Sequence, residues 1–425
     1  MGYLRDSERV LRIAIIGGGI AGLATAYGLD AHHDVVLFEA ADWLGGHTHT
    51  VDVPLTLASG ATHNYAVDTG FIVFNDATYP HFIRLLGQLG LQGQATDMSF
   101  SVANGSLEYA SHSLDGLFAQ RRRLLSVAHL NMLREILRFN RQARQLVGRD
   151  DPRTLAEFLA GEGYSDTFRD SYLLPLCAAI WSASLLDAQH FPADHFARFF
   201  NNHGLLQLRD RPQWRVVPGG SRSYVERLQE RLSAELRLSC PVESVQRHPE
   251  RVEIRSSAGS EQFDQVVFAC HSDQALSLLA DPSAQEQAIL GALPYVDNDV
   301  VLHTDASILP HNPRAWASWN FRVSPDRGRA AAITYHMNRL QGLEAPVEFC
   351  VTLNQSDRID PARVIERYRY AHPLYTPHSN QARAQRAQIN GQQRSWYCGA
   401  YWYNGFHEDG ARSALDVAQA LGGGW

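Results

Sequence analysis

The sequence predicts an α/β fold in which one domain is assembled from separate stretches of the chain and an α+β domain is inserted between them. Residues 12–39 combine a short β-branched run, a glycine-rich turn, a helical pattern and a second apolar run. Residues 80–205 show mainly helical spacing, whereas residues 295–355 carry apolar runs of strand length. Because the chain has 425 residues, more than one ordinary domain is expected.

The glycine-rich turn after the first apolar run has the spacing of a dinucleotide-binding crossover. Ile13 to Ile16 predict a buried strand, and Gly17, Gly19 and Gly22 occupy the three positions of a GxGxxG pattern. Gly17 allows the tight turn and Gly22 allows the helix to pack on the strand. Gly19 allows the backbone to approach a pyrophosphate. The pattern therefore predicts a Rossmann-like nucleotide site.

The helix start and the end of the second strand complete this site. Ile20 and Ala21 open the helix, where free backbone amides favour phosphate. The second strand, residues 35–38, ends at Glu39 and Ala40. A carboxylate there accepts hydrogen bonds from adenosine ribose hydroxyls and repels a 2′-phosphate, so FAD or NAD is predicted rather than NADP. A glycine turn without any ligand is the less favoured alternative.

The segments AADWLGGHTHTV and YAVDTGF distinguish FAD from NAD. They resemble two elements of the flavin amine oxidase superfamily, namely a double glycine that lies against the FAD pyrophosphate and a DxG element beneath the isoalloxazine. The superfamily usually has an arginine after the double glycine, where this chain has a histidine. The resemblance assigns to the FAD site Gly45, Gly46, His47, Thr69, Gly70 and Phe71.

Two later segments resemble the same superfamily. Strands are predicted at Val242 to Arg247, Arg251 to Arg255 and Gln265 to Ala269, in the order of its adenine-side β-meander, which implies that Val242 lies near the adenine. In the C-terminal segment CGAYWYNGFHEDG a strand ends and a helix then starts, and the superfamily aims the amides of this helix at the flavin pyrimidine ring. The residues implicated there are Gly399, His407, Glu408 and Asp409.

The positions of these elements along the chain predict the domain organisation. An FAD-binding domain is expected from residues 1–80, 206–280 and 390–425. A substrate domain, with a mixed sheet and a helical cap, is expected from residues 81–205 and 281–389. Non-covalent FAD is expected, because Cys398 falls in a strand where a packed small residue is the simpler interpretation.

Three side chains are candidates for catalysis. His203 and His407 lie in apolar or glycine-bounded segments and could transfer a proton near neutral pH, and Tyr401 directly precedes the flavin-facing loop. Each could instead be a packed core residue. The chain contains no lysine, so it cannot use the lysine-held water with which many of these amine oxidases support reoxidation by oxygen. His47 and His49 lack a further ligand nearby, so no metal site is expected.

The amino-acid composition indicates which partners and which cellular compartment to expect. A net charge of −7 gives no sign of nucleic-acid binding, and five scattered cysteines suit a reducing, cytoplasmic compartment. Arg121, Arg122 and Arg123 precede an amphipathic stretch, Leu124 to Arg144. This stretch is either a solvated helix face or a peripheral contact with an anionic inner-membrane surface.

Several phrases together are more specific than the superfamily. GGHTHTVDV, FFNNHGLL, WRVVPGGSRSYV, TYHMNRLQ and GFHEDG resemble bacterial flavoproteins similar to the N-terminal FAD domain of plant cyclopropane fatty acid synthases. That resemblance implies oxidation or desaturation of a lipid acyl chain, an apolar substrate, and a lipid methyltransferase as partner. Oxidation of a small amine, or an FAD-stabilised scaffold for the methyltransferase, are the alternatives.

Overall fold

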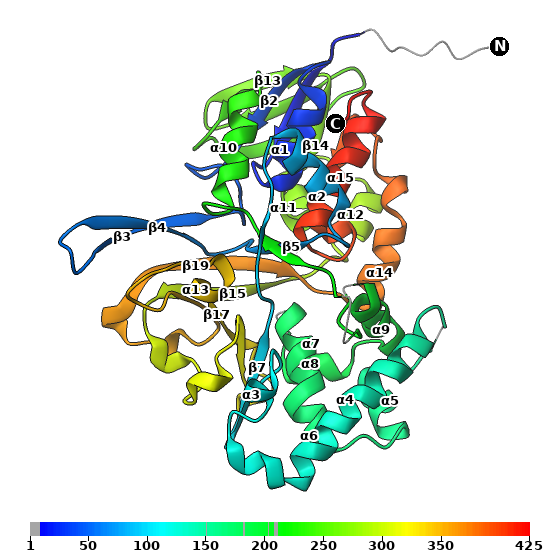
Figure 1. The fold of residues 1–425 in the computed structure, drawn as a ribbon. Helices are drawn as coiled ribbons and strands as arrows, with labels where there is room; N and C mark the ends of the chain where they lie inside the picture. Colours follow the sequence, from blue (N-terminus) through cyan, green and yellow to red (C-terminus); the bar gives the residue numbers. More distant parts are fainter. Residues whose placement is uncertain (1–8, 150, 182, 203, 208–210) are drawn as a thin grey trace.

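The computed structural model describes residues 9–149, 151–181, 183–202, 204–207 and 211–425 (Figure 1). The predicted crossover is confirmed as β1 (Arg12–Ile16), α1 (Ile20–Leu29) and β2 (Asp34–Phe38). These strands belong to a parallel sheet of order β10-β2-β1-β14-β20. Its other strands are β10 (Glu235–Arg237), β14 (Gln265–Phe268) and β20 (Ser395–Tyr397). The start, the middle and the end of the chain therefore build one sheet.

Helix α1 is buried on nearly every side because it lies between this sheet and the C-terminal helix α15 (His407–Ala420). The two helices approach closely at Gly28, where a Cβ atom would come within 2.8 Å of the Ala418 Cβ. The apolar character of residues 13–29 thus reflects a central helix and strand of a sheet domain.

The β-meander consists of β11 (Val242–Arg247), β12 (Val252–Ser256) and β13 (Gly259–Phe263). The prediction that Gln265 to Ala269 form its third strand is wrong. Residues 265–268 instead form β14, which pairs with β1 in the parallel sheet. A valine- and phenylalanine-rich run suits this central position, because β14 is covered on both faces.

A mixed seven-stranded sheet forms the second half of the molecule, as predicted, in the order β19-β15-β18-β17-β16-β7-β8. Its strands are β7 (Phe100–Asn104), β8 (Leu107–Ala110), β15 (Tyr295–His303), β16 (Trp319–Arg322), β17 (Ala332–His336), β18 (Cys350–Leu353) and β19 (Val364–Pro373). The hairpin of β7 and β8 comes from the stretch expected to be mainly helical, and it adds to the sheet through parallel pairing of β7 with β16.

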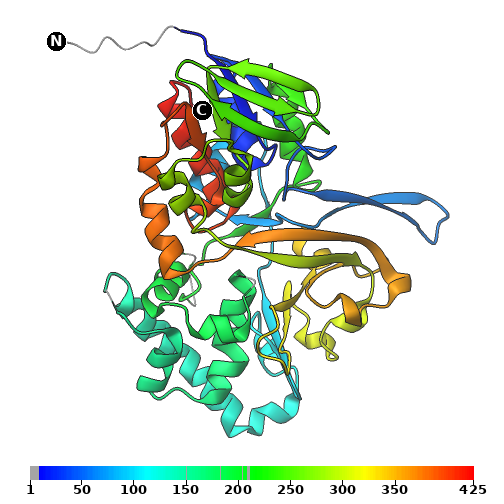
Figure 2. The ribbon, with the colours of Figure 1, turned by 180° about the vertical axis from the view of Figure 1, so that it is seen from behind.

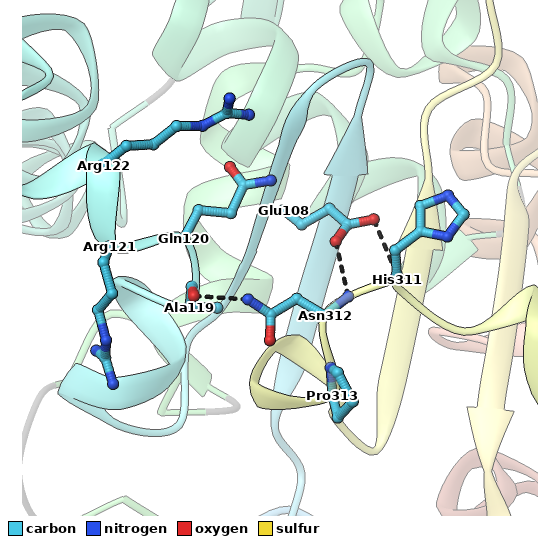
Figure 3. A pocket seen from close by; sticks show the side chains of 8 residues that line it. All are labelled: Glu108, Ala119, Gln120, Arg121, Arg122, His311, Asn312 and Pro313. Atoms are coloured by element: carbon cyan, nitrogen blue, oxygen red, sulfur yellow. Dashed lines mark hydrogen bonds between the residues drawn. The ribbon is translucent and has the colours of Figure 1, made fainter.

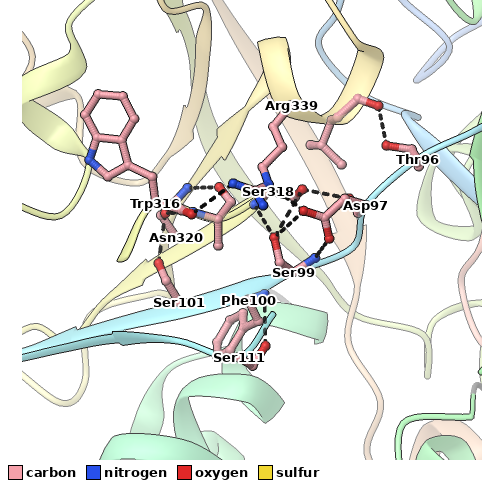
Figure 4. A network of polar contacts seen from close by, with 12 residues as sticks. Thr96, Asp97, Ser99, Phe100, Ser101, Ser111, Trp316, Ser318, Asn320 and Arg339 are labelled. Atoms are coloured by element: carbon pink, nitrogen blue, oxygen red, sulfur yellow. Dashed lines mark hydrogen bonds and ion pairs between the residues drawn. The ribbon is translucent and has the colours of Figure 1, made fainter. Parts of the chain in front are cut away.

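A polar network fastens β7 to β16 (Figure 4). The Ser318 hydroxyl donates to the Asp97 carbonyl at 2.6 Å, and the Ser101 hydroxyl donates to Oδ1 of Asn320 at 2.8 Å. Arg339 forms an ion pair with Asp97 from the other side. These bonds satisfy polar groups that the strand pairing buries, so the hairpin is held in one register.

A cap of helices packs beside the seven-stranded sheet in the second half of the molecule (Figures 1 and 2). The mainly helical spacing expected within residues 80–205 is confirmed by the helices of this cap. The cap and its neighbours comprise α3 (Leu114–Leu117), α4 (Val127–Leu146), α5 (Leu155–Gly161), α6 (Asp166–Phe168), α7 (Leu174–Trp181), α8 (Leu185–Gln189) and α9 (Ala193–Asn202). Within the described ranges, no helix combines the length and the apolarity needed to cross a membrane.

The remaining elements connect the two halves. The hairpin of β3 and β4 projects from the body in both views, and a small sheet of order β5-β9-β6 lies beside it. The strands are β3 (Thr50–Thr56), β4 (Thr62–Asp68), β5 (Val73–Asn75), β6 (Gln94–Ala95) and β9 (Trp214–Val216). The helices are α2 (Pro80–Gln88), α10 (Arg222–Arg231), α11 (Ser272–Leu278), α12 (Ala284–Leu290), α13 (Met337–Gln341) and α14 (Pro377–Ala384). The domain boundaries given above stay a prediction.

Candidate active site

The first glycine turn has the geometry of a phosphate loop. Gly17 has a φ of +110°, and its amide donates to the Phe38 carbonyl at 2.8 Å. A Cβ atom on Gly22 would lie 1.8 Å from the Gly17 carbonyl oxygen, so only glycine fits there. On Gly19 the nearest heavy atom to a Cβ would be 3.9 Å away. The space before Gly19, at the N-terminus of α1, is therefore left open by the protein, as a pyrophosphate requires.

The double glycine lies directly against this loop. The Gly45 amide donates to the Gly18 carbonyl at 2.8 Å, and a Cβ on Gly46 would lie 3.3 Å from the Cα of Gly19. Gly45 and Gly46 have φ values of +118° and +58°. A Cβ on Gly45 would lie 2.4 Å from the Thr48 carbonyl oxygen within its own loop, whereas a Cβ on Gly46 would press on the first loop, so both positions favour glycine.

The carboxylate of Glu39 lies at the end of β2, beside the glycine turn, as the dinucleotide-binding pattern predicts. Its Oε2 accepts from the Gly18 amide at 2.7 Å and its Oε1 accepts from the Ala41 amide at 2.8 Å. Each oxygen keeps a further lone pair for a ribose hydroxyl. The Cys240 amide donates to the Glu39 carbonyl at 2.8 Å, and this contact brings the start of β11, with Val242, alongside the same site. Ala40 is exposed at its edge.

The DxG element is locked to the loop after the double glycine. The Thr69 amide donates to the His49 carbonyl at 2.9 Å, and the Phe71 amide donates to the His47 carbonyl at 2.7 Å. A Cβ on Gly70 would lie 2.1 Å from the His47 carbonyl oxygen. The two loops therefore form one rigid wall, and glycine is required at residue 70.

His47 lies in a cluster of aromatic rings that comes from β19 and from the start of α11. Its ring centroid is 5.0 Å from Tyr370, 5.6 Å from His372 and 5.8 Å from His271. Burial, with smaller contributions from His372 and His271, lowers the pKa of His47 to about 3. Its Nε2 is buried and has no hydrogen-bond partner among the described residues. A neutral ring with an unsatisfied nitrogen thus directly follows the double glycine in the chain.

His407 opens helix α15 beneath Phe71. The two rings stack with centroids 3.6 Å apart and planes inclined by 9°. Nε2 of His407 lies 2.8 Å from the Tyr224 hydroxyl, which lies 2.7 Å from Oγ1 of Thr48. Burial holds the pKa of His407 well below its usual value, so the ring is neutral. The first helical bonds of α15 run from residues 409 and 410 to the carbonyl of residue 406, which leaves the amides of residues 407 and 408 at the open helix end.

Comparison with known proteins agrees with this geometry. Residues 20–306 match the model of the flavin-containing amine oxidoreductases. The chain belongs to this family. The flavoenzyme is thus an FAD-dependent oxidoreductase, and the glycine loops, the Glu39 carboxylate and the open space at Gly19 fit that cofactor. No curated protein matches its sequence to a significant degree.

Solved structures share the fold over nearly the whole chain. A fatty acid isomerase from P. acnes that produces CLA has a TM-score of 0.71 at 15% identity, covering 99% of this chain and 100% of its own. Cyclohexylamine oxidase from Brevibacterium oxydans IH-35A has a TM-score of 0.66 at 18% identity, covering 97% and 99%. Putrescine oxidase bound to putrescine has a TM-score of 0.67 at 15% identity, with the same coverage.

The carboxylates of two acidic residues at the start of α15 accept hydrogen bonds from backbone amides of the protein. The Glu408 carboxylate accepts from the amides of His81 at 3.1 Å and Phe82 at 2.9 Å, at the start of α2. Oδ2 of Asp409 accepts from the amides of Phe406 at 2.9 Å and Asn404 at 3.2 Å. Backbone amides that need a cap thus occupy both carboxylates, and the assignment of residues 408 and 409 to the flavin, which concerned the amides of the helix start, stays a prediction.

Tyr401 and Gly399 pack against each other at the end of β20. A Cβ on Gly399 would lie 2.3 Å from Cε1 of Tyr401, so the glycine makes room for the tyrosine ring. Tyr401 is buried in the apolar core, where burial raises the pKa of its phenol well above the usual value. A role for this phenol in proton transfer stays a prediction. His203 lies outside the described residues.

Sequence reasoning missed the partners of His407 and His47. Tyr224, Tyr370 and His372 reach the site from α10 and β19, which are far away in the sequence. The Pro-Gly-Gly turn before Tyr224 is the one local signal that could have located that residue. Ile20 contacts the C-terminal helix, since a Cβ on Gly410 would lie 2.7 Å from its Cγ2. Ala21 is buried beside it in α1.

Proposed function

We propose that this flavoenzyme oxidises or desaturates an acyl chain of a fatty acid or phospholipid by hydride transfer to FAD. A run of aromatic rings from the start of α15 into the helical cap carries the proposal. Phe406 stacks on Phe199 of α9 with centroids 5.3 Å apart, and Phe199 lies 4.7 Å from Trp181 of α7. Trp181 in turn lies 5.0 Å from Phe191. These rings belong to the buried apolar core between the start of α15 and the cap, and apolar surroundings there support a hydrocarbon over a charged substrate.

The chemistry needs a hydride acceptor and a base. FAD, when bound, supplies the acceptor. One carbon–hydrogen bond of the acyl chain loses its hydrogen with the bonding electron pair, and the neighbouring carbon loses a proton. The electron pair left by that proton forms the new double bond. We assign the base to His407, whose ring is neutral and is held in place by Tyr224, although its burial lowers the pKa and so weakens it as a base. His203 is the second candidate for this base.

Two similarities support the lipid assignment. The solved fatty acid isomerase shares the fold over the whole chain, and its name concerns a fatty acid. The motifs that resemble the FAD domain of plant cyclopropane fatty acid synthases point to the same substrate class and to a lipid methyltransferase as partner. A partner that methylates or cyclopropanates acyl chains would supply the substrate.

A small amine is the second candidate substrate, because cyclohexylamine oxidase and putrescine oxidase share the fold. The missing lysine counts against oxygen as the electron acceptor in that case. The two carboxylates buried nearest the flavin side, Asp68 and Asp409, bind groups of the protein itself. Asp68 accepts from the Ser221 amide at 2.8 Å and Asp409 from the Phe406 amide at 2.9 Å. Neither is free to bind an ammonium group.

Anaerobic photometry of the FAD-loaded enzyme tests the proposal without needing an electron acceptor. Dispersed fatty acids or phospholipids should bleach the oxidised flavin, and cyclohexylamine or putrescine should not. Bleaching by the amines alone would overturn the lipid assignment. If neither class bleaches a flavin that dithionite still reduces, the scaffold role would replace it. His407→Asn should slow the bleaching at least tenfold while the enzyme still retains FAD.

A further inference from the structure

We propose that the corner of the molecule formed by residues 114–144 docks on an anionic phospholipid surface. This docking corner comprises α3, the 3₁₀ turn Arg121–Leu125 and α4. It lies at the end of the molecule away from the parallel sheet, at the bottom of both views (Figures 1 and 2). The proposal concerns where the enzyme binds and does not depend on which substrate it oxidises.

Exposed apolar side chains gather in this corner. Of the ten large apolar side chains that are exposed among the described residues, six lie between residues 114 and 137. Their exposed fractions are 76% for Leu114, 49% for Leu124, 90% for Leu125, 81% for Val127, 45% for Leu130 and 45% for Leu137. Single exposed leucines are ordinary, but six large apolar side chains exposed within 24 consecutive residues are a concentration that favours an interaction site.

The outward stripe of α4 alternates apolar and basic residues. Helical spacing places Val127, Leu130, Arg134, Leu137 and Arg141 on one face, and all five are exposed. The opposite face buries Met132, Phe139 and Ala143 in the helical cap. The helix is therefore already anchored to the protein core, and its outward stripe is available to a partner.

The charge of the corner identifies that partner. Residues 114–144 contain seven arginines and two acidic residues, although the whole chain has a net charge of −7. Asp115 forms an ion pair with Arg121, and Glu135 is buried and accepts a hydrogen bond from the Ser165 amide at 2.9 Å. Arginines beside exposed leucines complement a surface that is negative at its headgroups and apolar below them. The surface of an ordinary protein partner does not place a negative layer over an apolar one.

A pocket of about 640 Å³ adjoins the arginines (Figure 3). Arg121 and Arg122 line one side of it, and Glu108 and His311 line the other. Glu108 already accepts from the amides of His311 and Asn312, both at 3.0 Å, so these two amides offset much of its charge. Arg122 and Arg123 both donate to the Ser106 carbonyl, so the two guanidinium groups lie close to each other beside the pocket residues. A lipid phosphate fits beside them, with the leucines of the 3₁₀ turn entering the acyl layer.

Vesicle flotation of the FAD-loaded enzyme tests the docking corner. The enzyme should bind vesicles of equal parts phosphatidylcholine and phosphatidylglycerol at least about tenfold more tightly than pure phosphatidylcholine, and added salt should weaken the binding. The double variant Leu124→Ser, Leu125→Ser and the triple variant that changes Arg121, Arg122 and Arg123 to Gln should each lose at least about tenfold. Unchanged flavin absorbance shows that each variant is folded.

Matched controls lie elsewhere on the surface. Leu186→Ser removes a leucine that is 47% exposed, and Arg255→Gln removes an exposed arginine of β12. Both should bind vesicles as the wild type does. Equal binding to the two vesicle types, or full binding by the corner variants, would overturn the proposal. A dimer in light scattering that Leu125→Ser dissociates, with no vesicle binding, would assign the corner to a second copy of the chain instead.

Discussion

The hydroxyl of Tyr224 lies 2.8 Å from Nε2 of His407, and this contact joins α10 to the first turn of α15. The same hydroxyl lies 2.7 Å from Oγ1 of Thr48, which follows the double-glycine loop. A single phenol therefore connects the proposed base to the loop that faces the FAD pyrophosphate. Its side chain is fully buried, so these bonds do not compete with water.

Tyr224→Phe should destabilise the enzyme by about 1–2 kcal/mol, because the change leaves a buried imidazole nitrogen and a buried hydroxyl without their partner. FAD should also dissociate faster, since the position of the double-glycine loop depends on Thr48. Urea unfolding and FAD fluorescence after dilution measure the two effects. Tyr65→Phe is the matched control, because that hydroxyl donates to the Glu344 carbonyl at 3.0 Å, away from the glycine loops. Equal FAD release from both variants would contradict the expected role of Tyr224.

Gly19→Ala and Gly22→Ala should fail in different ways. A Cβ on Gly19 meets no atom closer than 3.9 Å, so the variant should fold but bind FAD at least about tenfold more weakly. A Cβ on Gly22 would lie 1.8 Å from a carbonyl oxygen, so that variant should lose the fold itself.

Circular dichroism and FAD titration separate the two glycine effects. Gly87→Ala is the control, because no atom lies within 4 Å of its added Cβ and helix α2 should gain up to about 1 kcal/mol. Normal FAD affinity in Gly19→Ala would show that the open space does not receive the pyrophosphate.

The sequence predicted those parts of the site that depend on the local backbone. Gly17, Gly19, Gly22 and Glu39 occur at fixed offsets within one strand, turn and helix, so their spacing alone locates them. The second strand of the crossover and the helix at residues 127–146 follow from periodicity in the same way.

The other contacts depend on distant segments and could not be read from spacing. Strand β14 satisfies the pattern of a meander strand and that of a buried parallel strand equally well, and only its pairing with β1 decides between them. The Glu408 carboxylate lies at the start of α15 but caps α2, because the tertiary fold brings the start of that helix closer than the flavin side. The sequence places an acid in the first turn of α15, but it does not show that this acid caps α2.

Asp409 should make stability depend on pH. Burial raises the pKa of its carboxyl to about 7, against about 3.9 in an unfolded chain. A raised pKa favours the protonated acid in the folded state, so no penalty exists below pH 4 and the penalty grows as pH rises to about 7. Relative to Asp409→Asn, the wild type should therefore lose on the order of 2–4 kcal/mol of unfolding free energy between pH 4 and 7.

Glu261 provides a control of opposite sign for that experiment. Hydrogen bonds from Arg237 and Arg12 lower the pKa of Glu261 to about 2. Relative to Glu261→Gln, the wild type should keep its advantage above pH 4 and lose it as pH falls toward 2. Urea unfolding across the pH range measures both differences. A flat difference for Asp409→Asn would mean that its carboxyl is ionised throughout.

The buried ion pair of Arg247 with Glu286 joins β11 to α12 beside the parallel sheet. Both side chains are 2% exposed, and Tyr397 of β20 donates its hydroxyl to the same carboxylate at 2.6 Å. Arg247→Met should destabilise the enzyme by about 3–5 kcal/mol, because it leaves a buried carboxylate without its counter-charge. Arg247→Lys should recover only part of this loss, because an ammonium group cannot reproduce the two bonds to Glu286.

The double variant Arg247→Met, Glu286→Met separates the ion pair from simple packing. Removing both charges should restore most of the stability lost in the single variant, since no uncompensated charge stays in the core. Urea unfolding of the FAD-loaded enzyme gives the coupling between the two changes. If the two losses simply add, the carboxylate would have another source of compensation in the fold, and the pair would not be what holds β11 against α12.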